Sequence, residues 1–156
     1  MSQTTGVPDG PLYLDKAEPD IFAAMSGVSK KIVAAAGEAG ISERLLELVN
    51  LRISQINGCA YCLDIHHSKA IRLGEDPRRL AVLQDWQETD LFDDTESAAL
   101  ELAECITRIP APAVRGEVED VARRVLGDAA YAVVAWAAVN MNAFNRISIT
   151  SHHPVR

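Results

Sequence analysis

The sequence predicts an all-α protein, and three observations lead to that prediction. Helix-forming residues dominate and recur with the spacing of amphipathic helices. Glycine, proline and capping residues divide the chain into segments of helical length. Alternating apolar and polar runs bounded by turns, the pattern typical of strands, are essentially missing, and only residues 146–150 have an extended character.

The first three helices are predicted from periodic apolar residues that stop at glycines. They are expected over residues 20–36, 41–57 and 59–73. Gly58 separates the second helix from the third, and Gly74 ends the third, because glycine readily adopts the left-handed conformation that closes a helix.

Four further helices are predicted in the second half of the chain. A short one over residues 77–86 starts with a proline, which suits the first turn of a helix. The next opens at Asp93 and stops before Pro110, and the last two span 115–126 and 128–145.

The last predicted helix has almost no polar face before Asn140. A helix that is apolar on all sides is either central to the core or buried in a subunit interface. Both alternatives remain open from the sequence, and an oligomer would explain the excess of apolar residues.

Length and composition indicate one globular domain over residues 1–156, with an irregular segment over 1–18. The net charge of −7, without a basic cluster, argues against nucleic acid and anionic lipid as partners. No apolar run approaches the roughly 20 residues that span a bilayer, and the polar N-terminus does not resemble a secretory signal. Three cysteines make no disulfide framework, so we expect a cytoplasmic protein.

The pair Cys59 and Cys62 is the most informative feature of the sequence. At about 100° per residue both thiols lie on one helical stripe with His66, which follows Cys62 by four positions. A thiol beside an imidazole at a helix N-terminus ionises more easily, and the thiolate is the nucleophile. Three interpretations compete: two buried core cysteines, half of a zinc site with His66 as third ligand, and a redox dithiol with a histidine proton shuttle. We favour the redox dithiol and expect no metal.

The helix before this pair carries two charged residues of interest. Periodicity places Glu47 opposite the apolar stripe, as a residue in solvent, and Arg52 within the stripe, where a buried arginine needs an anionic partner. Elsewhere, Cys105 is expected in the core. The remaining aromatic and histidine residues considered are expected to pack or to lie in a polar tail without a metal role: Trp86, Trp136, His152 and His153.

Three stretches resemble one family. Residues 48–66 contain Leu-Arg-Ile-Ser-Gln-Ile-Asn-Gly followed by Cys-Ala-Tyr-Cys-Leu-Asp-Ile-His, residues 95–100 look like the start of the next helix, and residues 142–147 look like a closing Asn-x-x-Asn-Arg signature. Together they resemble the AhpD-like alkylhydroperoxidases of the carboxymuconolactone decarboxylase superfamily. The resemblance covers about residues 40–150, which it implies are the core of a single AhpD-like domain. The resemblance implies an AhpD-like bundle of six to seven helices that assembles as a trimer or a dimer of trimers.

The resemblance also implies a site. The family's glutamate lies twelve positions before the first cysteine, which makes Glu47 a member of a proton relay with His66. By analogy Cys62 attacks the peroxide and Cys59 condenses with it to a disulfide, although the opposite assignment of the two thiols stays open. Tyr61 stands where the best-known peroxidase form has a histidine. Tyr61 is an auxiliary candidate for the site for this reason, and Arg52 is a second one because it lies within the apolar stripe.

The implied activity is that of a thiol-dependent peroxidase, which takes a hydroperoxide as substrate and a thiol or dithiol as reductant. No Gly-rich nucleotide loop is present, so no cofactor is expected. Two alternatives remain: a redox-sensing oligomer without turnover, and a decarboxylase-type lyase acting on a small cyclic substrate. The decarboxylase branch lacks the paired thiols, so Cys59 and Cys62 argue against the lyase.

Overall fold

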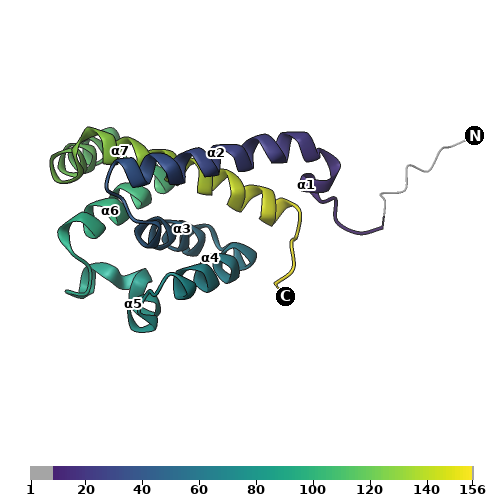
Figure 1. Ribbon diagram of the computed structural model, residues 1–156, viewed down its shortest axis with the longest axis horizontal. Helices are drawn as coiled ribbons and strands as arrows, with labels where there is room; N and C mark the ends of the chain where they lie inside the picture. The colour runs from purple at the N-terminus through teal and green to yellow at the C-terminus, as the bar shows by residue number, and fades with distance from the viewer. Residues whose placement is uncertain (1–8, 156) are drawn as a thin grey trace, which may run out of the picture.

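The computed structural model describes residues 9–155. Within that range the chain forms seven α-helices, one 3₁₀ helix and no strand, which confirms the predicted all-α class (Figure 1). The elements are α1 (Leu14–Ala17), α2 (Pro19–Glu38), α3 (Glu43–Asn57), α4 (Ala60–Arg72), α5 (Pro77–Val82), η1 (Leu83–Glu88), α6 (Asp94–Arg108) and α7 (Pro112–Thr150).

Helix α3 lies at the centre of the fold. It packs against α4, α6 and α7, while α2 runs along α7 to form the neighbouring layer (Figure 1). Because α3 has neighbours on several sides, almost every residue from 45 to 54 is buried, including charged ones. This enclosure positions the site described below, since α3 and α4 both carry its side chains.

The helix boundaries follow from side-chain caps near the predicted positions. Ser42 Oγ accepts the amide of Leu45 at the start of α3, and Asp93 forms a reciprocal capping box with Glu96 at the start of α6. Such caps satisfy amides that have no partner within the helix. Gly58 ends α3 in the left-handed conformation, with φ of 69°.

The structure corrects three boundary predictions. Residues 146–150 are helical rather than extended, because α7 continues to Thr150. The break predicted between the last two helices is confirmed at Gly127, whose φ of 76° lies outside the helical region, but the first of the two helices starts earlier than predicted, at Pro112. The helix predicted over residues 77–86 divides into α5 and the 3₁₀ helix η1, with a non-helical backbone at Asp85.

The N-terminal segment is less irregular than predicted. Residues 1–8 of the predicted segment 1–18 lie outside the described part of the chain, but α1 forms one helical turn within it. The amide of Leu14 donates to Ser151 Oγ at 3.0 Å, beyond the end of α7. Helix α1 therefore lies beside the end of α7 (Figure 1).

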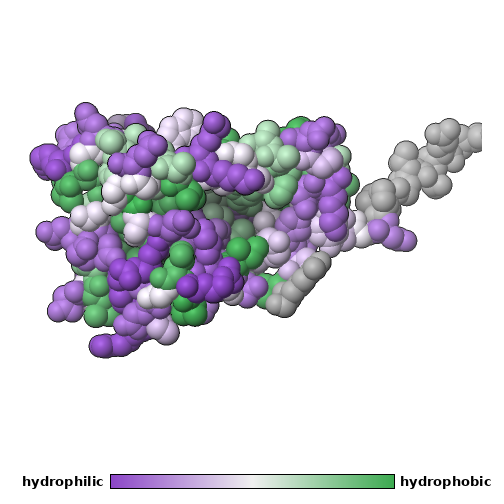
Figure 2. Space-filling model, viewed as in Figure 1, coloured by the Kyte–Doolittle hydropathy of each residue, from purple (hydrophilic) through white to green (hydrophobic). Residues whose placement is uncertain are grey.

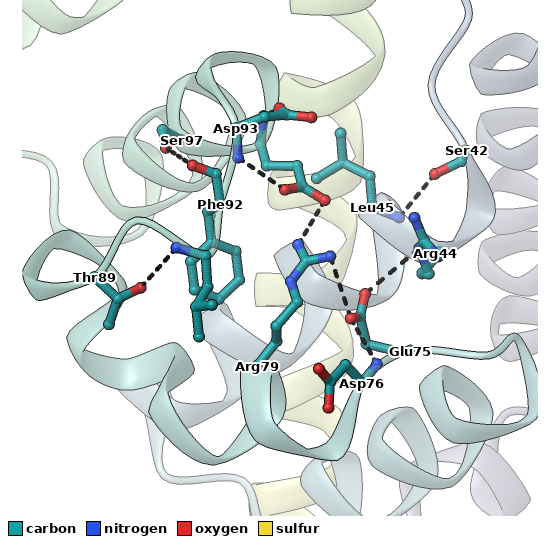
Figure 3. A network of polar contacts seen from close by, with 12 residues as sticks. Ser42, Arg44, Leu45, Glu75, Asp76, Arg79, Thr89, Phe92, Asp93 and Ser97 are labelled. Carbon is teal, nitrogen blue, oxygen red and sulfur yellow. Dashed lines mark hydrogen bonds and ion pairs between the residues drawn. The ribbon is translucent and has the colours of Figure 1, made fainter.

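A buried ionic network joins α3, α5, α6 and the turn before α5 (Figure 3). The Arg79 guanidinium pairs with Glu96 at 2.6 Å and with Glu75 at 3.3 Å. Arg44 approaches Glu75 from the surface, at 3.6 Å. The Glu75 side chain is only 1% exposed, so its charge depends on Arg79 for compensation.

We expect Arg79→Met to lower the free energy of unfolding by about 3 kcal/mol, since it leaves Glu75 as a buried charge without its inner partner. Arg44→Met is the matched control: half of the Arg44 side chain is exposed, so its loss should cost less than about 1 kcal/mol. Urea unfolding followed by circular dichroism measures both. Equal losses in the two variants would contradict this account of the network.

Candidate active site

The Cys-x-x-Cys segment sits at the start of α4. Cys59 is the residue that caps the helix, and its Sγ accepts the amide of Cys62 at 3.3 Å. The two cysteines are joined in a disulfide. A sulfur at this position faces the positive end of the helix dipole, which favours the thiolate when the disulfide opens.

Side-chain amides fix the turn that precedes Cys59. The Asn57 side chain donates to Asn142 and Asn145 at 2.9 Å each, and Asn145, which is fully buried, donates in turn to Ser54 at 3.0 Å. These bonds connect the last turn of α3 to α7. The Asn-x-x-Asn stretch predicted to be a signature therefore holds the turn that carries the dithiol.

The structure brings Glu47 of α3 together with His66 of α4. Glu47 Oε2 lies 2.6 Å from Nδ1 of His66, and the Glu47 side chain is 2% exposed. Glu47 is therefore buried and not in solvent, where periodicity had wrongly placed it, because α4 covers that side of α3. Nδ1 is engaged by the carboxylate, so Nε2 is left to exchange a proton, one helical turn from Cys62.

Lys69 is a residue of this cluster that sequence reasoning missed. Its Nζ lies 2.9 Å from Glu47 Oε1, so the carboxylate has a partner on each oxygen. Burial by itself would raise the pKa of Glu47, but His66 and Lys69 outweigh it and hold that pKa below its ordinary value of 4.5. The sequence did contain a signal for it: Lys69 follows His66 by three residues, and residues at that spacing lie on the same face of a helix.

A cavity of about 310 Å³ opens beside this cluster, between the α2–α7 layer and the α3–α4 layer. Cys62, His66, Glu47 and Lys69 line it, whereas Cys59 is not among its lining residues. Most of the remaining wall is apolar and comes from α2, α4 and α7: Phe22, Ile32, Val33, Ile65, Met141 and Phe144. The hollow with hydrophobic side chains is visible in Figure 2.

Tyr61 also lines the cavity, beside two residues that the sequence did not predict for the site. The His153 ring lies against the Tyr61 ring, with centroids 4.9 Å apart, and Asp15 Oδ1 lies 3.0 Å from His153 Nε2. Asp15 and His153 are 138 positions apart. No local pattern could have paired them.

Arg52, an auxiliary candidate, lies elsewhere. Its Nε pairs with Glu104 of α6 at 2.6 Å, and Glu104 also accepts the indole N–H of Trp86 at 2.9 Å. Burial would raise the pKa of Glu104, but Arg52, Trp86 and Arg108 together lower it. Arg52 is not among the residues that line the cavity. The anionic partner that a buried arginine requires is therefore Glu104, and the contact is structural.

Other sequence predictions can be placed as well. Cys105 is buried, as expected, whereas Trp136 is 61% exposed and packs only partly. Between residues 9 and 155, no three His, Cys, Asp or Glu side chains form a group that could hold a metal ion. None of the helices in that range is long and apolar enough to cross a membrane.

The fold and site define a class: an all-α protein with a dithiol at a helix N-terminus, next to a carboxylate–imidazole pair in an apolar cavity. The sequence profile of the Carboxymuconolactone decarboxylase family matches residues 19–104, more than half of the chain. The chain belongs to this family, and its fold is AhpD-like.

The chain is also similar to three individual proteins. The uncharacterized protein YdfG of Bacillus subtilis is 38% identical over 112 residues, which are 72% of this chain and 76% of YdfG. The uncharacterized protein YnjA of Escherichia coli is 44% identical over 64 residues, 40% of this chain and 35% of YnjA. A crystal structure from Agrobacterium tumefaciens, described as a protein of unknown function and candidate antioxidant defence protein AhpD, has a TM-score of 0.83 at 25% identity, covering 95% of this chain and all of that one.

The contact between Lys69 and Glu47 predicts a change with pH. Because the pKa of Glu47 is lowered in the folded state, the carboxylate stabilises the fold above the ordinary value of 4.5, and this contribution is lost as pH falls through the lower, folded pKa. Lys69→Met should raise the folded-state pKa of Glu47 towards that ordinary value, so the loss of stability on acidification should be smaller, and complete at a higher pH, than in the wild type. Unfolding free energies measured across the acid range test this, with the exposed Arg72→Met as control. The same dependence of unfolding free energy on acid pH in Lys69→Met and Arg72→Met would contradict a role of Lys69 in lowering the Glu47 pKa.

Proposed function

We propose that this protein is a thiol-dependent peroxidase that reduces organic hydroperoxides through the Cys59–Cys62 dithiol. The observation that carries the proposal is the placement of Cys62 in the cavity wall with His66, whose Nδ1 is held by the buried Glu47 carboxylate at 2.6 Å. A nucleophile, a base and a group that orients the base is the arrangement that activates a weak nucleophile.

In the first half of the cycle, His66 takes the proton of the Cys62 thiol, and Glu47 stabilises the imidazolium that forms. The thiolate attacks the terminal oxygen of the hydroperoxide, the O–O bond breaks, and Cys62 becomes a sulfenic acid while the alcohol leaves. We assign the attack to Cys62 rather than Cys59, because Cys62 lines the cavity and Cys59 does not.

In the second half, Cys59 condenses with the sulfenic acid, which releases water and forms the disulfide. A thiol or dithiol reductant then attacks the Cys62 sulfur, and Cys59 leaves as a thiolate. The Cys62 amide, 3.3 Å from the Cys59 sulfur, stabilises this leaving group. A second thiol of the reductant attacks the resulting mixed disulfide, which releases Cys62 and the oxidised reductant. The cycle needs only thiol chemistry and no bound cofactor, and we expect it to operate in a reducing compartment such as the cytoplasm.

The test is the steady-state consumption of an alkyl hydroperoxide by the protein with a panel of monothiols, small dithiols and dithiol proteins. Sustained turnover with at least one donor is the expected result. Formation of a disulfide without turnover on any donor would instead favour a redox sensor. Lyase activity on a small cyclic substrate that survives the loss of both cysteines would favour the decarboxylase-type alternative.

We also propose that the protein is a homo-oligomer, a trimer or a dimer of trimers. The supporting feature is an apolar surface shared by α2 and α7, formed by Val28, Trp136 and Val139, each more than a third exposed in the single chain. A large aromatic side chain exposed among aliphatic ones is typical of an interface between subunits.

Trp136→Glu should weaken that assembly, because it places a charge at the centre of the apolar surface. Sedimentation velocity should show a smaller species than the wild type at the same concentration. The exposed Ile109→Glu, at the far end of α6, is the control and should leave the sedimentation coefficient unchanged. An unaltered coefficient for Trp136→Glu would exclude this surface as the interface.

A further inference from the structure

A second carboxylate–imidazole pair lines the cavity that holds Cys62. His153, in the tail beyond α7, has its Nε2 3.0 Å from Asp15 Oδ1 and its Nδ1 3.4 Å from Ser148 Oγ. Asp15, Ser148 and His153 all line the cavity, as do Glu47 and His66. Both ring nitrogens of His153 face oxygen atoms, so a doubly protonated ring can donate from each.

The His153 ring is held in place by its neighbours. Tyr13 stacks on it with centroids 5.3 Å apart, and Tyr61 contacts it at 4.9 Å. The His153 side chain is 11% exposed, and Ser148 is buried. Tyr61 directly precedes Cys62, and both line the cavity that Asp15, Ser148 and His153 line. These three residues come from different elements than the Glu47–His66 pair.

Two proton-carrying pairs on different elements suit the two proton transfers of peroxide reduction. Attack by Cys62 requires a base for the thiol proton, and cleavage of the O–O bond requires an acid for the departing alkoxide. One imidazole that has just accepted the first proton must turn to a different atom to deliver it. A second imidazole, already directed at a hydroxyl in the cavity wall, removes that requirement.

We propose that Asp15, His153 and Ser148 form a second proton relay, which protonates the alkoxide that leaves when Cys62 attacks a hydroperoxide; this inference rests on the function proposed above. The Cys62 thiol gives its proton to His66, and the sulfur forms a bond to the terminal oxygen as the O–O bond breaks. The alkoxide takes the proton of Ser148, and Ser148 takes one from Nδ1 of His153. Asp15 orients the ring. After the step, His66 releases its extra proton to solvent and His153 takes one from solvent, so the protons balance.

The experiment compares two oxidants that differ in the basicity of their leaving group. tert-Butyl hydroperoxide releases an alkoxide, which needs a proton, whereas peracetic acid releases acetate, which does not. Rates of oxidation of the reduced protein are measured for the wild type, His153→Gln, Ser148→Ala and Asp15→Asn. His152→Gln, at the exposed neighbouring histidine, is the matched control.

We expect His153→Gln to slow the reaction with tert-butyl hydroperoxide by roughly 100-fold, the usual contribution of a general acid, and to leave the peracetic acid rate within about threefold of wild type. Ser148→Ala and Asp15→Asn should show the same selectivity. Equal losses with both oxidants would overturn the relay and assign these residues a structural role, and so would an unchanged rate with tert-butyl hydroperoxide. A wild type oxidised by neither reagent would overturn the peroxidase itself.

Discussion

Cys62→Ser should abolish hydroperoxide reduction, with a loss on the order of 10³-fold or more, because the attacking sulfur is removed. Cys62 is the cysteine of the pair that lines the cavity, and His66 lies one turn away on the same helix. Cys59→Ser should behave differently. It should still consume one equivalent of peroxide and then stop, with Cys62 left as a sulfenic acid that dimedone labels.

Cys105→Ser is the control for both variants, since that thiol is buried and has no partner cysteine in the described chain. It should retain the wild-type rate. The opposite pattern, a complete loss in Cys59→Ser and one equivalent of consumption in Cys62→Ser, would reverse the roles of the two cysteines. The remainder of the proposed cycle would then have to start from the helix-capping sulfur.

Glu47→Gln should lower the rate of Cys62 oxidation by on the order of 10²-fold, because the amide keeps the shape of the side chain but removes the charge that stabilises the His66 imidazolium. The carboxylate is buried and paired on both oxygens, with His66 at 2.6 Å and Lys69 at 2.9 Å. Stopped-flow oxidation of the reduced protein measures the effect.

Glu43→Gln provides the comparison for that variant. Glu43 lies one turn earlier on α3, is half exposed, and approaches Lys69 only at 3.7 Å. Its rate should match the wild type. If Glu47→Gln and Glu43→Gln were equally active, Glu47 would be a structural partner of Lys69, and proton transfer would depend on His66 alone.

Much of the fold could be predicted because its signals are local. Ser42, Asp93 and Gly58 cap helices at or next to the predicted ends, since capping depends on residues within one turn. The dithiol and His66 could be predicted for the same reason: they share one helix, where spacing determines which side chains lie together. The end of α7 shows the limit of such local prediction: the helix continues to Thr150 instead of ending at the predicted Asn145.

The rest of the site depends on contacts between distant segments. Glu47 was misplaced by periodicity, since α3 is covered on more than one side and a single apolar stripe does not describe it. Only the family resemblance recovered it. Asp15 and His153 come from opposite ends of the described chain and meet through the docking of α1 beside Ser151, a contact without a sequence pattern.

The central claim is that Cys59 and Cys62 reduce hydroperoxides as a pair. The most direct test mixes the fully reduced protein with one equivalent of alkyl hydroperoxide and counts free thiols. The chain has three cysteines, and the account predicts that two thiols disappear for each peroxide consumed, with Cys105 left free. Three thiols remaining after the peroxide has been added would contradict it.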